Sequence, residues 1–372
     1  MSENLTTPIE LLSTGNIVSA SIRIYRDNFQ SYFGVAIRAT LWFLLPFLAL
    51  IPVSLILSYG QANISNSIFF LLIPVWLLLF AFCTAKSIVN SAIINRLVFG
   101  ILANQPETVR EVRRNLTLKM RSFFWAFVLL FLIVVGIYLS FPVAIVILIS
   151  IILLPISVMA AIANIELNIQ PDIIQNNIVI LAIIISGFIG MIFIVTCYYL
   201  TIRLLTRFFI LDMPLAVEEN MTATKSLGRS WELTKGYIGR IFVILLTAIL
   251  VALPISMVLN IISEIFSNIL ILKTTFFNIS FNSLFDTLGA VRILVLPFDM
   301  TILLPLSIIV MILGNVLGSP NYLLASLIQD YAIISLSNIL LLPFWQTIKA
   351  VIYYDFQTSR KGMGLQLRKQ DI

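Results

Sequence analysis

Residues 95–122 read NRLVFGILANQPETVREVRRNLTLKMRS and join two long apolar stretches, near 68–94 and 123–162. Six side chains of this segment are basic, whereas the two flanking stretches together contain a single lysine. Basic segments that flank apolar ones mark the cytoplasmic side of a membrane protein. The pattern therefore predicts a cytoplasmic connection between two membrane-spanning helices.

The same alternation runs through the whole chain. Eighteen of the 23 Lys and Arg residues lie in this segment, in an N-terminal arm, in residues 203–240 and in the tail after Asp355. The apolar stretches between them run near 33–59, 68–94, 123–162, 178–202, 238–262 and 331–354. Each supplies the roughly 20 residues that a helix needs to cross a bilayer. Continuous apolar runs predict helices rather than the alternating strands of a barrel.

The composition agrees with a membrane protein. Hydrophobic residues make up 60% of the chain and charged residues 11%, with a mean hydropathy of +1.06. A soluble domain carries about 25% charged residues. The net charge of +6 is interpreted as the signal that orients the chain, so no nucleic acid is expected as a partner. The first apolar run begins near Phe33 and is too long for a signal peptide.

Charge bias predicts six crossings with both termini in the cytoplasm. Two further apolar segments, 142–162 and 300–318, would reverse the orientation of the basic segments that follow them if they crossed completely. They contain Pro142 and Pro305, and proline favours a break in a helix. We therefore expect both segments to lie on the outer side, as re-entrant, interfacial or packed elements.

The six crossings form three hairpin units, about 16–100, 104–212 and 218–358, followed by a basic tail, 359–372. Segment Ala49–Leu57 (ALIPVSLIL) resembles Val251–Leu259 (VALPISMVL), which indicates a duplication. The same offset pairs Gly34 with Gly236 and Arg38 with Arg240, while chance similarity between apolar spans stays the alternative. No flexible linker divides the chain, so a single all-α transmembrane domain is expected.

An amphipathic segment precedes each hairpin and is expected to lie in the cytoplasmic interface. In the first arm, Val18, Ile22 and Tyr25 follow helical spacing against a polar face with Arg23 and Arg26. In residues 106–121 the apolar positions are Val109, Val112 and Leu116, and Pro106-Glu107 suits a first turn. Residues 221–238 give a weaker third version, with Lys225, Arg229 and Glu232 on the polar side.

The chemistry open to this chain is narrow because it contains no histidine. This excludes Ser-His and Cys-His nucleophilic pairs and histidine metal sites. Neither a phosphate-binding glycine loop nor a dinucleotide fingerprint occurs. Cys83 and Cys197 fall inside apolar runs and are expected to be buried. No cofactor and no metal are predicted.

Charges within or beside the spans are the candidate functional residues. Snorkelling to the headgroups explains most of them, and the alternative is a ring of cations that binds anionic lipid headgroups. The headgroup candidates are Arg23, Arg26, Arg38, Lys86, Arg110, Arg113, Arg114, Arg203, Lys225, Arg229, Arg240 and Lys349. Arg292 and Asp299 form a second pair of candidates near the outer segment 300–318, seven residues apart.

Three motifs resemble bacterial proteins of the glycerophosphoryl diester phosphodiesterase membrane-domain family. They are Arg23-Ile-Tyr-Arg-Asp-Asn-Phe29, Ser230-Trp-Glu-Leu-Thr-Lys-Gly236 and the closing run from Pro343 to Arg360. The resemblance implies a six-helix membrane module. It does not imply phosphodiesterase activity, because the chain has no histidine and no soluble region of the size of the catalytic barrel.

Three functions remain open. The first is a non-enzymatic membrane protein that handles or senses lipid, or supports envelope homeostasis, with anionic lipids as partners. The second is a transporter or channel for a small or hydrophobic substrate, because repeats and broken helices occur in transporters. The third is a scaffold for a membrane-protein partner, which would contact the outer apolar segments.

Overall fold

The computed structural model describes residues 12–49, 66–137, 198–271 and 320–361, together with residues 188, 191–192 and 195–196. These residues form helices and turns, as the apolar runs predict, and contain no strand. Among them four helices are long and apolar enough to cross a membrane: Pro74–Leu102, Met120–Ile137, Ile238–Leu259 and Ser335–Ser359. The all-helical, multi-span character agrees with the prediction, while segments 142–162 and 300–318 lie outside the described residues.

The chain divides into two compact units. The first comprises Met1–Phe127 and Thr206–Ile372, and the second comprises Val128–Leu205. The second unit falls within the middle predicted hairpin, about 104–212, most of which lies outside the described residues. The first unit combines the first and third predicted hairpins.

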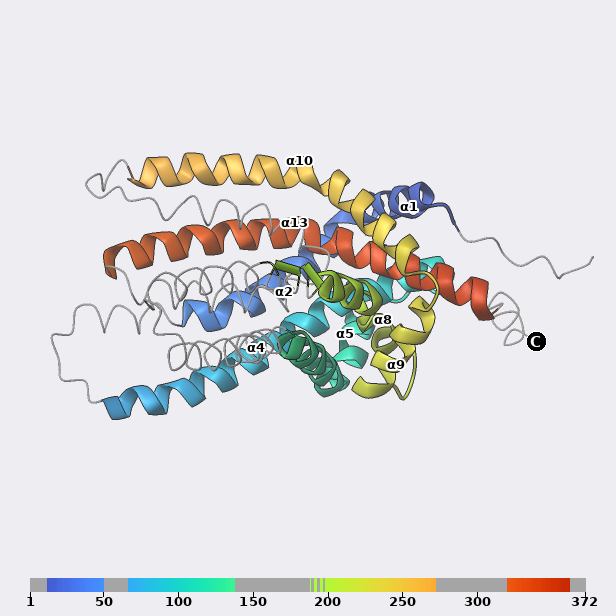
Figure 1. Cartoon of the computed structure of the whole chain (residues 1–372), viewed down its shortest axis with the longest axis horizontal. Coiled ribbons are helices and arrows are strands. Elements are labelled where there is room, and N and C mark those ends of the chain that lie inside the picture. The colour runs from blue at the N-terminus through green and yellow to red at the C-terminus, as the bar shows by residue number, and fades with distance from the viewer. Residues whose placement is uncertain are drawn as a thin grey trace, which may run out of the picture. The chain divides into compact units, whose positions relative to one another are not determined.

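Four long helices build the first unit (Figure 1). They are α2 (Phe29–Leu48), α4 (Asn66–Leu102), α10 (Ile238–Ile271) and α13 (Pro320–Lys361). Helix α13 contacts the other three, and α2 also contacts α4. Helices α2 and α10 run away from the end at which α1 lies, whereas α4 and α13 return to it (Figure 1).

The short helices gather at that same end, which we call the polar end (Figure 1). They are α1 (Thr14–Asp27), α5 (Val109–Leu118), α8 (Asp212–Val217) and α9 (Ala223–Thr234). This arrangement matches the predicted pattern, in which short amphipathic segments precede outgoing helices.

Small residues let α2 and α13 approach closely. Ala36 and Ala39 are buried against Leu342 in one apolar cluster. Beside it the Asn338 side-chain amide donates to the Thr40 hydroxyl at 3.1 Å, so the buried polar groups are paired. Small side chains and interhelical hydrogen bonds are the usual means by which helices associate in lipid, because the hydrophobic effect does not drive association there.

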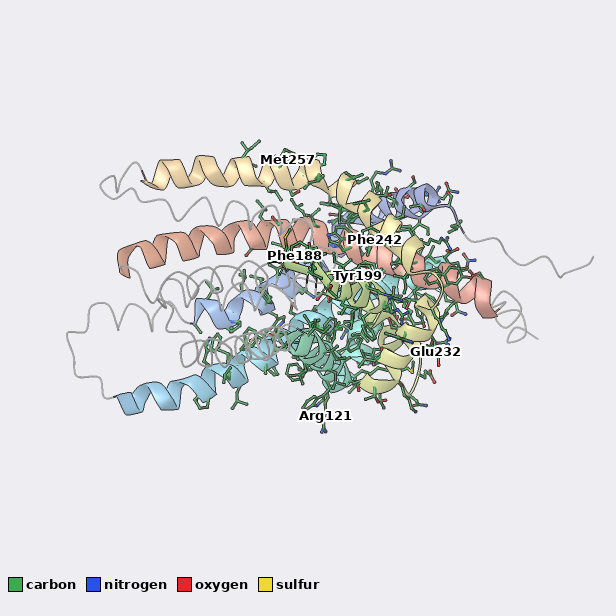
Figure 2. The ribbon with its side chains drawn as sticks, viewed as in Figure 1. Arg121, Phe188, Tyr199, Glu232, Phe242 and Met257 are labelled. Atoms are coloured by element: carbon green, nitrogen blue, oxygen red, sulfur yellow. The ribbon has the colours of Figure 1, made fainter. Side chains whose placement is uncertain are left out.

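Helix α10 presents a broad apolar face that the described protein does not cover. Ten of its large hydrophobic side chains are exposed, among them Phe242 and Met257 (Figure 2). Its opposite face is buried through residues such as Ile241, Ile244 and Ala248. A soluble protein rarely leaves such a continuous apolar surface in water. The exposed face therefore agrees with contact to lipid tails.

Helix α1 differs from its predicted orientation. Its buried side chains are Ile17, Val18, Ser21 and Ile24, whereas Ile22 is 40% exposed. Of the predicted apolar face, Val18 packs inside the protein and Ile22 lies on the surface. The helix rotates because its contacts are with α10 and α13, and the Tyr25 hydroxyl donates to the Leu340 carbonyl oxygen at 3.0 Å. Burial raises the pKa of Tyr25 to about 12.

Candidate functional site

The turn that follows α4 brings an acidic side chain back onto the helix. A Cβ at Gly100 would lie only 2.7 Å from the Gln105 carbonyl oxygen, so this close approach requires glycine. Asn104 then adopts a left-handed backbone, with φ of 56°. The chain thereby places Glu107 beside Arg96, and each carboxylate oxygen accepts a hydrogen bond of 2.7 Å from Nε or Nη2. Arg96 is neutralised by this bidentate pair.

Helix α5 begins at Val109, two residues later than the Pro106-Glu107 start that the sequence predicts. The prediction is wrong because Glu107 is bound to Arg96 and Thr108 caps the helix. The Thr108 hydroxyl accepts from the Glu111 N–H, and the Glu111 carboxylate accepts from the Thr108 N–H at 3.1 Å. These two hydrogen bonds form a capping box. The Thr108 hydroxyl also donates to the Glu111 carboxylate at 2.7 Å, and this bond, followed by the one from the Thr108 N–H, lowers the pKa of Glu111.

The apolar face of α5 lies as predicted. Val112 and Leu116 are completely buried, and α5 contacts α4. Arg110 and Arg114 on the other faces are exposed. The helix is therefore anchored by two apolar side chains while it presents basic ones outward.

A buried polar cluster joins α4, α8 and α13. The Lys349 ammonium lies 3.2 Å from Asp212 Oδ2, and the Asn95 amide donates to the same oxygen at 2.7 Å. The Lys349 and Asp212 side chains are only 3% and 2% exposed. Lys349 Nζ also lies 5.4 Å from the centre of the Phe209 ring. Each buried charge thus has an opposite charge within contact distance, which burial requires.

Glu218, at the end of α8, is a second junction. Its Oε1 accepts from the Tyr353 hydroxyl at 2.7 Å, from Gln357 Nε2 at 3.1 Å and from Arg229 Nε at 3.2 Å. Its backbone carbonyl accepts from Lys119 Nζ at 2.8 Å. Burial, followed by the nearby charge of Arg96, lowers the pKa of Lys119. Glu218 therefore ties α9 and α13 to the segment after α5.

A third junction joins α10 and the segment before α1 to α13 at the polar end. Arg240 Nη2 lies 2.8 Å from Asp355 Oδ2 and also donates to the Leu12 carbonyl oxygen. The other carboxylate oxygen of Asp355 accepts from the Leu12 N–H at 3.0 Å. The Asp355 side chain is 5% exposed and is paired with Arg240.

The predicted headgroup candidates separate into two sets. Arg229, Arg240 and Lys349 belong to the junctions just described and are paired with carboxylates. Arg26 contacts Asp27 at 3.3 Å on an exposed surface. Lys86 lies 5.6 Å above the Phe82 ring. The exposed members are Arg23, Arg38, Arg110, Arg114 and Lys225. Arg203 belongs to the second unit, and Arg292 and Asp299 lie outside the described residues.

Arg113 stands apart from both sets. Its Nε and Nη2 atoms are enclosed by protein and have no hydrogen-bond partner among the residues that the structure describes. Burial lowers its pKa, and the nearby positive charge of Arg38 lowers it further. Arg113 is therefore a cation that forms no ion pair with a described carboxylate.

Sequence reasoning missed Asp212 and Glu218, the acids at the centre of two junctions. Their partners on α13 are 137 and 135 positions away along the chain, so no local spacing reveals them. One signal was present: a lysine placed inside an apolar run, such as Lys349, requires a buried counter-charge.

The described residues hold no group of three or more His, Cys, Asp or Glu side chains that could bind a metal ion. Their arrangement can do two things chemically: the paired charges fix helix ends, and the unpaired cations can attract anions. Comparison with protein-family models, curated sequences and solved structures gives no match to this chain.

Proposed function

We propose that this chain is a non-enzymatic protein of a bacterial inner membrane that handles or senses anionic lipids in envelope homeostasis. In this proposal the polar end faces the cytoplasm, both termini lie there, and six helices cross the membrane as three hairpins. The direction of α2, α4, α10 and α13 supports it, because α1, α5 and α9, which carry predicted basic residues, lie at the polar end (Figure 1). Membership of the membrane-domain family is part of the same proposal.

The distribution of carboxylates among the cations is the observation that carries the lipid role. Carboxylates at the polar end form ion pairs with Arg96, Arg229, Arg240 and Lys349. The positive charges of these four side chains are therefore compensated within the protein. Arg38 and Arg113 have no carboxylate within ion-pair distance among the described residues, and the same holds for Arg110 and Arg114. Each basic residue near an anionic leaflet contributes about 1 kcal/mol of attraction.

Helix α5 gives these cations a fixed direction. Its buried Val112 and Leu116 hold it against the protein, and its exposed arginines are free to meet headgroups. Arg121, which follows α5, also projects outward (Figure 2). A cytoplasmic basic face of this kind fits a leaflet that contains phosphatidylglycerol or another acidic phospholipid.

The test is retention of anionic lipid by purified protein. The variant with Arg110, Arg113 and Arg114 all changed to Gln removes three cations from α5 but leaves Arg96, Lys119 and Arg121 for orientation. We expect it to insert and fold normally and to retain several-fold less phosphatidylglycerol than wild type in native mass spectrometry. A variant with Lys235, Arg360 and Lys361 changed to Gln, none of which is a headgroup candidate, is the charge-matched control. Equal retention by wild type and the α5 variant would refute the lipid role of this face.

A transporter is the second candidate, and the buried polar cluster favours it. Lys349 lies within the span Ser335–Ser359 and is buried within contact distance of Asp212, the first residue of α8. Ionisable residues inside a membrane often mark ion or proton paths. The test is solute uptake into proteoliposomes that contain the purified protein. Uptake by wild type that is lost in a folded Asp212→Asn variant would favour the transporter over the lipid role.

A further inference from the structure

The backbone of Leu12 is held at two points by side chains of two other helices. Its N–H donates to Asp355 Oδ1 at 3.0 Å, and its carbonyl oxygen accepts from Arg240 Nη2. Asp355 belongs to α13 and Arg240 to α10, and the two side chains form an ion pair of 2.8 Å. The pair therefore offers one residue an acceptor and a donor side by side, as a neighbouring β-strand would.

This recognition uses the backbone of Leu12 and not its side chain, which is 41% exposed. The Arg240–Asp355 pair is held in place by α10 and α13 themselves. The Arg240 guanidinium lies 5.7 Å from the centre of the Phe356 ring, and that ring stacks on Tyr237 at 5.3 Å. A change of the Leu12 side chain should therefore leave the contact intact, whereas loss of its N–H should break it.

Helix α1, which follows Leu12, is attached to the same two helices along its length. It contacts α10 and α13, and near its other end the Tyr25 hydroxyl donates to the Leu340 carbonyl oxygen of α13 at 3.0 Å. Along the chain α1 leads into α2 and belongs to the first predicted hairpin, whereas α10 and α13 belong to the third. Helix α1 therefore joins two hairpins that lie far apart in the sequence.

Helix α10 depends on α1 more than the other long helices of this unit do. Among the described helices its main contacts are with α1 and α13. Helices α2 and α4, in contrast, contact each other as well as α13. The opposite face of α10 carries exposed apolar side chains, such as Met257, and contacts no described helix closely (Figure 2). Loss of α1 would thus remove one of the two main supports of α10.

We propose that Leu12, Arg240 and Asp355 form a latch that holds α1 on α10 and α13, and that its release lets α10 move away from α13. This conformational device does not depend on the lipid role. The latch consists of hydrogen bonds and one ion pair at the polar end, and water can replace such contacts at a small net cost. Release of α1 is therefore expected to need less free energy than unfolding of the helix bundle.

The first experiment measures release of α1 by maleimide labelling of purified full-length protein, with Cys83 and Cys197 replaced by Ser. The reporter is Ser21→Cys, because Ser21 is completely buried on α1. Ser91→Cys on α4, at a position 3% exposed, reports opening of the bundle. The two serines are matched, since each hydroxyl donates to a carbonyl oxygen of its own helix.

Three variants test the latch in each reporter background. Leu12→Pro removes the N–H that Asp355 binds, and Arg240→Gln removes the guanidinium that binds the carbonyl oxygen. Leu12→Ala keeps both backbone groups and is the matched control. We expect Leu12→Pro and Arg240→Gln to raise the labelling rate at position 21 about tenfold, and Leu12→Ala to leave it unchanged. The rate at position 91 should stay the same in all three.

Two outcomes of this labelling would overturn the latch. An unchanged rate at position 21 in both Leu12→Pro and Arg240→Gln would show that other contacts hold α1. An equal rise at positions 21 and 91 would show that α1 opens only together with the bundle.

The second experiment measures the movement of α10 by pulsed electron–electron distance measurement between two spin labels. Suitable sites are Leu78 on α4 and Met257 on α10, whose side chains are 72% and 60% exposed. Leu12→Pro should add a population with a longer distance, whereas Leu12→Ala should keep the wild-type distribution. Faster labelling at position 21 without any change in this distance would show that α1 does not control α10, and would overturn that part of the proposal.

Discussion

The buried pair of Asp212 and Lys349 provides a quantitative test of how the polar end is held together. At 3.2 Å and an effective dielectric constant of about 20, their Coulomb attraction is roughly 5 kcal/mol. Desolvation of two side chains that are 2–3% exposed offsets most of this gain. The pair should therefore add little net stability, whereas removal of one partner should be severe.

The perturbation is a double-mutant cycle. Lys349→Met leaves the Asp212 carboxylate buried with only its hydrogen bonds, and Asp212→Asn leaves the Lys349 ammonium without its counter-charge. Each single change should lower the free energy of unfolding by about 3–5 kcal/mol. The double variant, which buries neither charge, should lose only about 1 kcal/mol. The expected coupling energy is therefore several kcal/mol.

The assay is reversible unfolding of the purified protein in mixed micelles with increasing SDS, followed by tryptophan fluorescence and far-UV circular dichroism. The control pair is Arg26→Gln with Asp27→Asn, because that ion pair is 76% and 53% exposed. Its coupling should be below about 1 kcal/mol. If the losses of Lys349→Met and Asp212→Asn simply add in the double variant, the two groups do not compensate each other and the reasoning fails.

Three other predictions concern the same end of the molecule. Gly100→Ala should destabilise the protein by about 2 kcal/mol in the same unfolding assay, because its Cβ would meet the Gln105 carbonyl oxygen. The control is Gly228→Ala, inside α9 with open space around it, which should stabilise the protein by up to about 1 kcal/mol. Glu218→Ala should lower the free energy of unfolding by about 3 kcal/mol, since three side-chain donors lose their acceptor. Glu219→Ala, at an exposed neighbour, should change the free energy of unfolding little. Equal effects of the two variants would contradict the role of Glu218 in joining the helices. The pKa of Glu111 in the folded protein lies below its usual 4.5, so its capping contribution is complete above pH 4.5 and is lost as the pH falls below that value. Hydrogen exchange of the α5 amides should show this loss in wild type and not in Thr108→Ala.

The elements that the sequence predicts well are those set by local pattern. Long apolar runs give the long helices, and the spacing of Val112 and Leu116 identifies the buried face of α5. The start of α5 is mispredicted because Glu107 is drawn to Arg96 by tertiary structure, so the cap moves to Thr108. The residues of α1 that pack inside the protein, such as Ile17 and Ile24, are set by its contacts with other helices and were not identified from its own periodicity.

The candidate site is predictable only in part. Counting basic residues finds the cations but cannot tell which of them are neutralised. Arg96 and Arg113 stand in the same basic segment, 95–122. In the structure Arg96 contacts Glu107, whereas Arg113 has two enclosed nitrogens without an acceptor among the described residues. The difference depends on partners brought together by the fold from distant parts of the chain.

Orientation is the central claim, because the lipid role requires the polar end to face the cytoplasmic leaflet. The most direct test is cysteine labelling in intact cells, in a background with Cys83 and Cys197 replaced by Ser. Single cysteines at Asn115 and Gly228 are suitable because both positions are exposed, the first within α5 and the second within α9. We predict that a membrane-impermeant maleimide labels neither position in intact cells and labels both after the cells are permeabilised. Labelling of either position in intact cells would place the polar end outside and contradict the account.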